Sequence, residues 1–398
     1  MFRLSNLNKF IKEGWCYLSC DLSVTEIENP FEETPMWVAV EEQNADMLAD
    51  NVYDPFVLIP VYVGMRYKQD VHIDGNISPK LYHNVRHYLM DIFDRFSDKT
   101  SPIQFTVNGF DTAEQTGSLI GTGFSCGIDC CSTIYDHYFN ETNPNFKINS
   151  LFFFNCGSHG EFNDKATLKN FNDRTALNRL AAKELGLPMY LVNTNYHAFC
   201  GFNSSEYMYL ASYSCVLSLQ RYIKLYYTSS NLSYDEIAQY SKISRNDDIA
   251  EYSESFMVHL TSTEKCELVI DGYQYTRAEK MERISDWTFA QKYLNVCMAH
   301  KTDDGHNCTN CHKCAMTLIV LEAMGKLEQY KNVFDLDVWR KNAFRWKCWF
   351  ESIYGKKPPY GSSTIPYARA HGMILPPNWV AVIVRFARHW LHKFGVLK

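Results

Sequence analysis

Short apolar segments alternate with helical patterns between residues 117 and 228, and this alternation limits the fold more than any other feature of the sequence. The segments expected to be strands are 117–124, 148–155, 189–193 and 222–228. The helices expected between them cover about 129–139, a long stretch that ends before Gly186, and 211–219. Most of these strands are apolar on both faces, which is typical of a parallel sheet with helices on both sides. We therefore predict an α/β fold with a parallel, doubly wound sheet and right-handed crossovers.

The regions that flank this alternation differ from it. Residues 1–112 mix short apolar runs with turn signals and are predicted to form an accessory α+β region. Within it, 56–63 is expected to be a strand broken at Pro60, and 81–93 a helix. Residues 113–330 would form the α/β domain, which ends in a cysteine-rich segment. Residues 331–398 are predicted to be a basic, aromatic-rich helical extension.

Composition narrows the class of protein. Apolar residues make up 46% of the 398, enough for a sizeable core, so wholesale disorder is unexpected. No window approaches the roughly 20 apolar residues that cross a bilayer, and no secretory leader pattern is visible. We expect a cytoplasmic protein without a transmembrane segment, and a homo-oligomer is possible. In a reducing compartment, clustered members of the 14 cysteines indicate metal ligands or reactive thiols rather than disulfides.

The turn between the first predicted strand and its helix suits an anion. It contains Ser125, Gly127 and Asp129. A helix start presents unpaired N–H groups and the positive end of the helix dipole, and a serine hydroxyl can donate to a phosphate oxygen. Asp129 can hold a Mg²⁺ that bridges phosphates, or it can cap the helix. Such residues also occur in turns that bind nothing, and neither a Walker motif nor a dinucleotide fingerprint is present.

This turn resembles the Ser-Gly-Gly-x-Asp-Ser loop of the N-type ATP pyrophosphatases, or PP-loop superfamily. The resemblance implies an adenine nucleotide alpha hydrolase-like fold, ATP and Mg²⁺ as cofactors, and catalytic roles for Ser125, Asp129 and Cys130. Two positions depart from the family loop, because Cys126 stands where Gly is usual and Cys130 where Ser is usual. The resemblance, together with the segments expected near the loop, implies a set of nucleotide-binding residues. They are Ser125, Cys126, Gly127, Ile128, Asp129, Cys130, Asn155, Ser229, Arg277 and Lys280.

A second motif indicates metal binding. Cys308, Cys311 and Cys314 follow the spacing C-x2-C-x2-C, and Cys297 lies eleven residues upstream. Three closely spaced thiolates can bind one metal ion, and a fourth completes a tetrahedron, so Zn²⁺ is the predicted metal. His300 and His306 are alternative fourth ligands, and an iron–sulfur cluster is the alternative to zinc.

The four-cysteine pattern C-terminal to such a loop resembles the 7-cyano-7-deazaguanine synthase family over about residues 117–330. That family uses ATP and ammonia to convert a carboxylate into an amide and then a nitrile, and its zinc is structural. The arginine that follows the last cysteine in that family is replaced by Ala315 here. The resemblance implies a distant homologue with a different substrate, which would be a small-molecule or peptide carboxylate.

The C-terminal sixty residues are basic. From residue 339 to the end there are eleven Lys or Arg, one acid and 12 aromatic residues, while the whole chain carries a net charge of −6. This composition is consistent with nucleic-acid binding, and 380–394 with a helix in a membrane interface. We slightly favour a third interpretation, a basic lobe that covers the acidic remainder of the protein.

These features give one leading function and two rivals. The leading hypothesis is ATP-dependent adenylation of a carboxylate or amide with release of pyrophosphate, followed by nitrogen transfer. The first rival is ATP-dependent sulfur transfer to RNA, in which Cys126 or Cys130 carries sulfur. The second rival is a nucleotide-binding scaffold that has lost the reaction.

Overall fold

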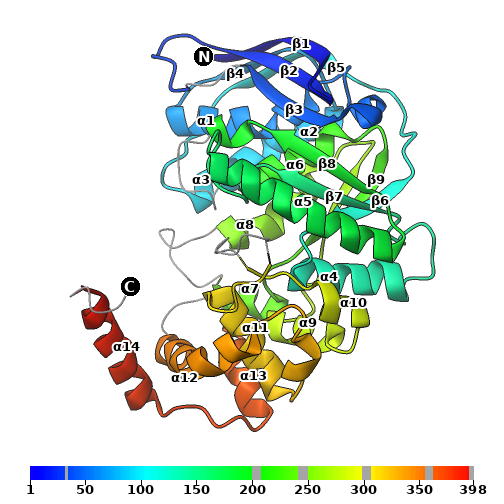
Figure 1. Ribbon diagram of the computed structural model, residues 1–398. Helices are drawn as coiled ribbons and strands as arrows, with labels where there is room; N and C mark the ends of the chain where they lie inside the picture. Colours follow the sequence, from blue (N-terminus) through cyan, green and yellow to red (C-terminus); the bar gives the residue numbers. More distant parts are fainter. Residues whose placement is uncertain (32–34, 200–207, 241–249, 298–305, 355–361, 394–398) are drawn as a thin grey trace. The chain divides into compact units, whose positions relative to one another are not determined.

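The computed structural model describes residues 1–31, 35–199, 208–240, 250–297, 306–354 and 362–393 (Figure 1). The chain divides into two compact units. Unit 1 comprises residues 1–124, 137–229 and 242–271, and unit 2 comprises 125–136, 230–241 and 272–398. Among the described residues, no helix is both long and apolar enough to cross a membrane.

Unit 1 is an α/β structure built on one ten-stranded, mostly parallel sheet with the strand order β10-β9-β6-β7-β8-β3-β2-β1-β4-β5. Its strands are β1 (Phe2–Lys12), β2 (Trp15–Val24), β3 (Met36–Glu41), β4 (Val71–Ile77), β5 (Phe105–Phe110), β6 (Leu119–Gly123), β7 (Ser150–Asn155), β8 (Met189–Thr194), β9 (Ile223–Ser229) and β10 (Glu267–Asp271). The block from β10 to β8 is parallel throughout, and β3, β2 and β1 continue the sheet in antiparallel pairs. The four strands predicted between residues 117 and 228 are confirmed as β6 to β9. Strands from the first 112 residues extend the same sheet.

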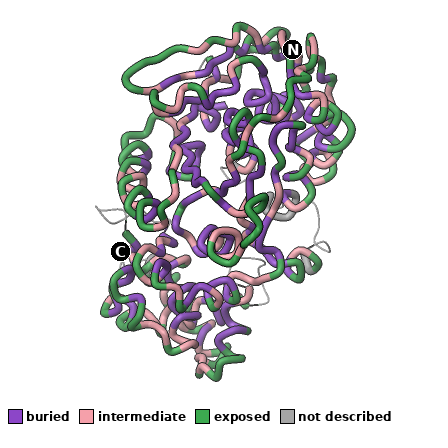
Figure 2. Tube along the Cα trace, turned by 90° about the vertical axis from the view of Figure 1, so that its right-hand side faces the viewer, coloured by how far each residue is buried: buried purple, intermediate pink, exposed green. Residues whose placement is uncertain are grey.

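The helices of unit 1 cover both faces of β7. The α-helices are α1 (Leu58–Tyr67), α2 (Pro79–Asn84), α3 (Met90–Phe96), α5 (Lys165–Leu185), α6 (Met208–Ser218) and α8 (Ala250–Met257). Short 3₁₀ or π segments are η1 (Glu42–Met47), η2 (Asp54–Phe56), η3 (Val85–Leu89), η5 (Tyr196–Phe199) and η6 (Val258–Thr261). Alternate side chains of a strand point to opposite faces. Accordingly Phe152 and Phe154 join the large core, whereas Phe153 stacks on Phe171 of α5. The strand is buried along its whole length. Figure 2 shows in purple where the buried residues of the chain lie.

Two local expectations have different outcomes. The long helix α5 ends as predicted, because Gly186 takes the left-handed conformation (φ 70°) that caps a helix C-terminus. The strand expected at 56–63 is wrong, since this apolar run forms η2 and α1 instead. Pro60 stands in the first turn of α1, where a backbone N–H needs no partner within the helix. Eight of the ten residues of α1 are buried, so the run has no period that would distinguish a helix from a strand.

Unit 2 is helical. Its elements are α4 (Ile128–Ile134), α7 (Tyr234–Tyr240), α9 (Arg277–Ile284), α10 (Thr288–Tyr293), α11 (His312–Ala323), η7 (Leu327–Tyr330), α12 (Leu336–Ile353), α13 (Thr364–Ala370) and α14 (Asn378–Lys393). A π-helical segment, η4 (Tyr135–Asn140), follows α4, and its residues from 137 onward belong to unit 1. The apolar helix α11 packs against α9, α12 and α13, and α4 packs against α9. Helix α11 begins within the cysteine triplet, directly after Cys311.

Candidate functional site

Four thiols of unit 2 form a group with the geometry of a metal site. The sulfur atoms of Cys297, Cys308, Cys311 and Cys314 all lie within 4.8 Å of one another. Cys311 Sγ is 3.9 Å from Cys297 Sγ and 3.5 Å from Cys314 Sγ. A tetrahedral zinc ion with Zn–S bonds of about 2.3 Å holds its sulfurs about 3.8 Å apart. The four-cysteine group therefore fits the zinc ion that the spacing predicts.

The start of α11 shapes this group. Cys311 is the N-cap residue, and its sulfur accepts a hydrogen bond from the backbone N–H of Cys314 at 3.5 Å. Hydrogen bonds from the neighbouring thiols, first that of Cys297, hold the pKa of Cys311 below that of a free thiol. The turn before α11 places Thr309 in the left-handed region (φ 58°), and its hydroxyl accepts a hydrogen bond from Asp335 N at 3.0 Å. These contacts fix the triplet onto the helix that follows it.

Asn307, which the sequence analysis missed, joins the two halves of the cysteine group. Its side-chain oxygen accepts hydrogen bonds from Val296 N (2.8 Å) and Cys297 N (3.1 Å). Its amide nitrogen donates to Leu294 O (2.8 Å) and Val333 O (2.9 Å). The buried Asn307 thus holds the distant fourth cysteine in place. Its position directly before the triplet was the one available signal, because residues that hydrogen-bond around a metal site hold the ligands in orientation.

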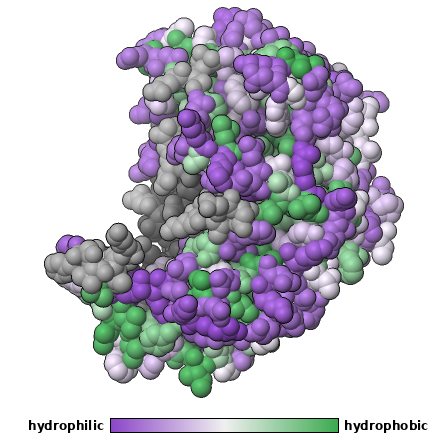
Figure 3. Space-filling view, viewed as in Figure 1, coloured by the Kyte–Doolittle hydropathy of each residue, from purple (hydrophilic) through white to green (hydrophobic). Residues whose placement is uncertain are grey.

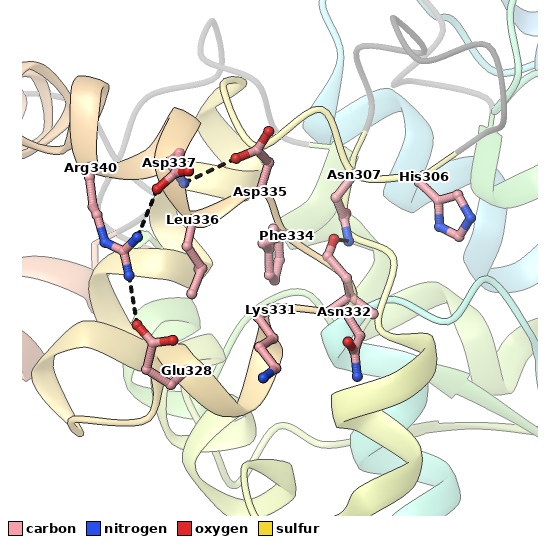
Figure 4. Close-up of a pocket in the computed structure, with 11 residues that line it drawn as sticks. His306, Asn307, Glu328, Lys331, Asn332, Phe334, Asp335, Leu336, Asp337 and Arg340 are labelled. Carbon is pink, nitrogen blue, oxygen red and sulfur yellow. Dashed lines mark hydrogen bonds and ion pairs between the residues drawn. The ribbon is translucent and has the colours of Figure 1, made fainter.

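Of the two alternative histidine ligands, His306 is not part of this group. His306 lines a neighbouring open cavity of about 580 Å³ in unit 2 (Figure 4), and His300 lies outside the described residues. Three charged residues of this cavity pair with each other, since Arg340 contacts Asp337 at 2.8 Å and Glu328 at 2.7 Å.

The loop that precedes α4 has an unusual backbone at one position. Cys126 takes a left-handed conformation with φ 56°. Gly127, the glycine of this turn, has φ −75°, which any residue adopts. The left-handed residue is therefore Cys126, at the position where the resembled loop has glycine.

Polar contacts within the loop involve Ser125, Gly127 and Cys130. Ser125 Oγ accepts a hydrogen bond from Gly127 N at 3.3 Å and lies 3.7 Å from Cys130 Sγ. The Cys130 thiol donates to Gly127 O at 3.4 Å. A hydrogen bond with the Cys131 thiol lowers the pKa of Cys130, although burial opposes this shift. The hydroxyl and the thiol that the sequence proposes as site residues thus lie side by side.

Asp129 lies in the first turn of α4 and meets two cations of α9. Arg277 Nη2 is 2.5 Å from Asp129 Oδ2, Arg277 Nε is 3.3 Å from Oδ1, and Lys280 Nζ is 3.7 Å from Oδ1. Arg277 also donates to Asn231 Oδ1 at 2.8 Å, and Lys280 to Ser230 O at 2.5 Å. Burial acts to raise the pKa of Asp129, but the charges of Arg277 and Lys280 outweigh it and hold this pKa below its ordinary value.

The start of α9 explains why both cations face α4. Thr276 and Glu279 form a capping box, which fixes the first turn that carries Arg277. Lys280, one turn later, is only 1% exposed. Lys280 is therefore a buried cation and not part of a solvated helix face.

Two predicted nucleotide contacts belong to unit 1. The Asn155 amide donates to Asn193 Oδ1 at 2.8 Å, and Ser229 Oγ lies 3.5 Å from Thr122 Oγ1. The buried Oδ1 of Asn155 has no hydrogen-bond partner in the described part of the chain, so a donor on a ligand could satisfy it. Ser158 contacts the buried His159 at 3.2 Å. The roles of Asn155 and Ser229 stay predictions.

Together the fold and the site define an α/β protein with a ten-stranded, mostly parallel sheet and a four-cysteine group that can hold zinc. No protein-family model matches the chain, and neither the curated proteins nor the solved structures compared with it show a significant match.

Proposed function

We propose that this protein binds ATP at the Ser125–Cys130 loop and uses it to adenylate a carboxylate or amide, with nitrogen transfer to the activated carbon. The observation that carries the proposal is the convergence of Arg277 and Lys280 on Asp129 at the start of α4. Arg277 and Asp129 are 148 residues apart in the chain, so this grouping does not follow from local structure.

The charges of this cluster suit a phosphate group. A pyrophosphate can accept hydrogen bonds from the N–H groups of the first turn of α4, from the Ser125 hydroxyl and from the two cations. Phosphate oxygens that take over the contacts of Arg277 and Lys280 would release the Asp129 carboxylate. That carboxylate is ionised at neutral pH, and it would be the protein ligand for Mg²⁺, which neutralises charge on the phosphates. The same cations would stabilise negative charge as pyrophosphate leaves.

The backbone at Cys126 gives independent support. A left-handed residue at the glycine position means that this loop keeps the conformation glycine would favour, although a cysteine stands there. The fold proposed with this function is the doubly wound, adenine nucleotide alpha hydrolase-like arrangement, and the parallel block from β10 to β8 is consistent with it.

The four-cysteine group has a separate role in this proposal. It would hold a structural Zn²⁺, which has no free coordination position when four thiolates bind it. The turn that precedes α11 also anchors α12, because Asn310 Oδ1 accepts hydrogen bonds from Arg345 and from Trp346 Nε1. The metal would therefore stabilise unit 2 without taking part in the reaction.

The test is calorimetry with Mg·ATP, followed by product analysis with candidate acids. Mg·ATP should bind, and the products should be AMP and pyrophosphate rather than ADP and phosphate. Asp129→Ala should abolish binding and leave the zinc content unchanged. The matched control is Asp136→Ala, since Asp136 pairs with Arg283 of the same helix α9 but lies two turns from the loop. If millimolar Mg·ATP gives no heat and no stabilisation, the scaffold rival replaces this proposal.

The lowered pKa of Cys130 favours one further candidate, sulfur transfer to RNA, because a thiolate is the reactive form. Cys130→Ser separates the two reactions. An adenylating enzyme should tolerate this change, since it restores the hydroxyl of the resembled loop. A sulfur carrier that uses this thiol should lose turnover, while the neighbouring Cys131→Ser should keep it.

A further inference from the structure

Helix α14 carries an apolar stripe that is exposed to solvent. Trp379, Ile383, Phe386 and Trp390 are spaced by four, three and four residues, which places them on one helix face. Their exposed fractions range from 45% to 68%, which is high for large apolar side chains. Figure 3 shows the hydrophobic side chains gathered over α14, at the lower left.

The opposite face of α14 is the one that packs. Helix α14 packs against α12, and Ala381 is fully buried. At about 100° per residue, Ala381 stands roughly opposite the centre of the stripe. The stripe therefore faces away from α12, and burial within this helix pair does not account for it.

The charged residues of α14 are all basic, and they are Arg385, Arg388 and Lys393. At about 100° per residue, Lys393 stands beside the stripe, Arg385 lies farther round the helix, and Arg388 lies on the same side as Ala381. The Lys393 ammonium lies 5.1 Å from the ring centre of Trp390. An outward apolar stripe with tryptophan near both ends, on a helix that carries cations and no acid, is the pattern of a helix that lies in a membrane interface.

We propose that α14 binds the surface of an anionic lipid bilayer, with its apolar stripe inserted at the level of the headgroups and its cations on the lipid phosphates and carboxylates. Sixteen residues make a helix about 24 Å long, which can lie flat on a bilayer. Each basic residue near an anionic surface strengthens such binding, and the apolar side chains provide the part that salt does not screen.

Two other occupants fit the stripe less well. A nucleic acid would place charged phosphates against Ile383, which cannot stack on a base, whereas single-strand binding relies on aromatic stacking within a basic groove. A second copy of α14 would bring two helices of the same positive charge together. The lipid surface satisfies both the apolar stripe and the positive charge of the helix.

The experiment is flotation of the full-length protein with vesicles of phosphatidylcholine and phosphatidylserine at 7:3, compared with vesicles of phosphatidylcholine alone. Binding to the mixed vesicles should be clearly stronger, and the tryptophan emission should shift to the blue. Trp379→Phe/Trp390→Phe should remove this shift. Ile383→Asp should weaken binding by at least about 10-fold. The matched control is Leu180→Asp on α5, a similarly exposed leucine, which should leave binding unchanged.

The electrostatic part has its own pair of variants. Arg385→Ser/Lys393→Ser should weaken binding to the mixed vesicles by about 25-fold, since each cation contributes about a factor of five. Lys165→Ser/Lys183→Ser on α5 removes the same charge and should have no effect. The proposal is overturned if neither vesicle binds. Salt-sensitive binding of single-stranded RNA that Ile383→Asp leaves intact would overturn it in favour of nucleic acid. A dimer in solution that Ile383→Asp dissociates would overturn it in favour of a second copy.

Discussion

The cysteine group and the Ser125–Cys130 loop are both in unit 2, but they are assembled in different ways. The four cysteines lie within 18 residues of one another, and their spacing alone predicts their grouping. The loop obtains its charges from α9, and the partner of Asp129 is 148 residues away. A site built from neighbouring residues can be predicted from the sequence. For a site completed by a distant helix, the sequence does not show which residues of that helix meet the loop.

The two sites also differ in how their negative charge is compensated. Four thiols within 4.8 Å of one another need a cation to accept their charge once they ionise. Asp129 is already neutralised by Arg277 and Lys280 without any ligand. We therefore expect the metal at the cysteine group to be part of folding, and a ligand at the loop to exchange with an existing ion pair.

The largest effect should come from the cysteine group. Cys311→Ser removes the thiol that caps α11 and contacts two others, so it should abolish metal binding. Metal binding at such sites is coupled to folding, and unit 2 should lose at least about 5 kcal/mol of stability. The measurements are metal content by mass spectrometry and thermal unfolding. Wild-type protein should contain one zinc ion per chain and be colourless.

The control for this variant is Cys348→Ser, a fully buried thiol of α12 outside the group. It should cost only about 1–3 kcal/mol and keep the metal. A Cys311→Ser protein with normal zinc content would show that the four thiols are not the site. If the protein is brown and contains iron and sulfide, the site holds an iron–sulfur cluster rather than zinc. That outcome would favour the sulfur-transfer rival.

The second effect concerns the ion pair at the loop. Asp129→Ala should destabilise unit 2 by about 3 kcal/mol, because it leaves the buried Lys280 without a carboxylate. The double variant Asp129→Ala/Lys280→Met should recover a large part of this loss, since both members of the pair are then absent. Chemical denaturation of the two variants measures the difference. Equal stability of the single and double variants would mean that Lys280 does not depend on Asp129, and the contrast between the two sites would weaken.

The parallel part of the sheet could be predicted because its strands are apolar and separated by helices with clear ends. Gly186 marks the end of α5, and Ser150–Asn155 is buried at every position. The strand predicted at 56–63 failed for a physical reason: α1 is buried on nearly all sides, so its residues show neither the period of a helix nor that of a strand. The antiparallel strands of residues 1–41 could not be placed, since their pairing with β8 depends on tertiary structure.

The candidate site shows the same limit at the level of residues. All four cysteines follow from spacing, but Asn307 does not, because an amide that holds a cysteine ligand in place has no motif of its own. Arg277 and Lys280 could be suggested as phosphate ligands, but their contacts with Asp129 depend on the packing of α9 on α4. Cys126 could be recognised as a departure from the resembled loop, while its left-handed backbone is a property of the folded chain.

The third effect is a pH dependence, which tests whether Arg277 and Lys280 keep the Asp129 carboxylate ionised. Its pKa is lower in the folded protein than the value of about 3.9 in an unfolded chain. The stabilising contribution is therefore complete above about pH 4 and is lost as the pH falls through the folded pKa. Unfolding free energies of wild type and Asp129→Asn should differ at pH 7 and converge below pH 4. A constant difference down to pH 2 would contradict the ion pair, and an Asp136→Asn series controls for the other carboxylates.

The smallest effect tests the backbone of the loop. At ordinary positions alanine is more stable than glycine by about 0.5–1 kcal/mol, because glycine has more freedom to lose on folding. At a left-handed position the order reverses, since a Cβ atom costs roughly 1–2 kcal/mol there. Cys126 has φ 56°, so Cys126→Gly should be more stable than Cys126→Ala by about 1 kcal/mol. At Gly127, with φ −75°, alanine should be tolerated, because its Cβ would meet only Ser125 Oγ at 3.3 Å and Asn295 O at 3.9 Å. Chemical denaturation of these three variants gives the order of their stabilities directly.

If Cys126→Ala proves more stable than Cys126→Gly, the loop does not keep the glycine-like conformation, and one support for nucleotide binding is lost. If the predicted order holds, Cys126→Gly should also retain Mg·ATP binding, because it restores the residue of the resembled loop without changing the path of the backbone.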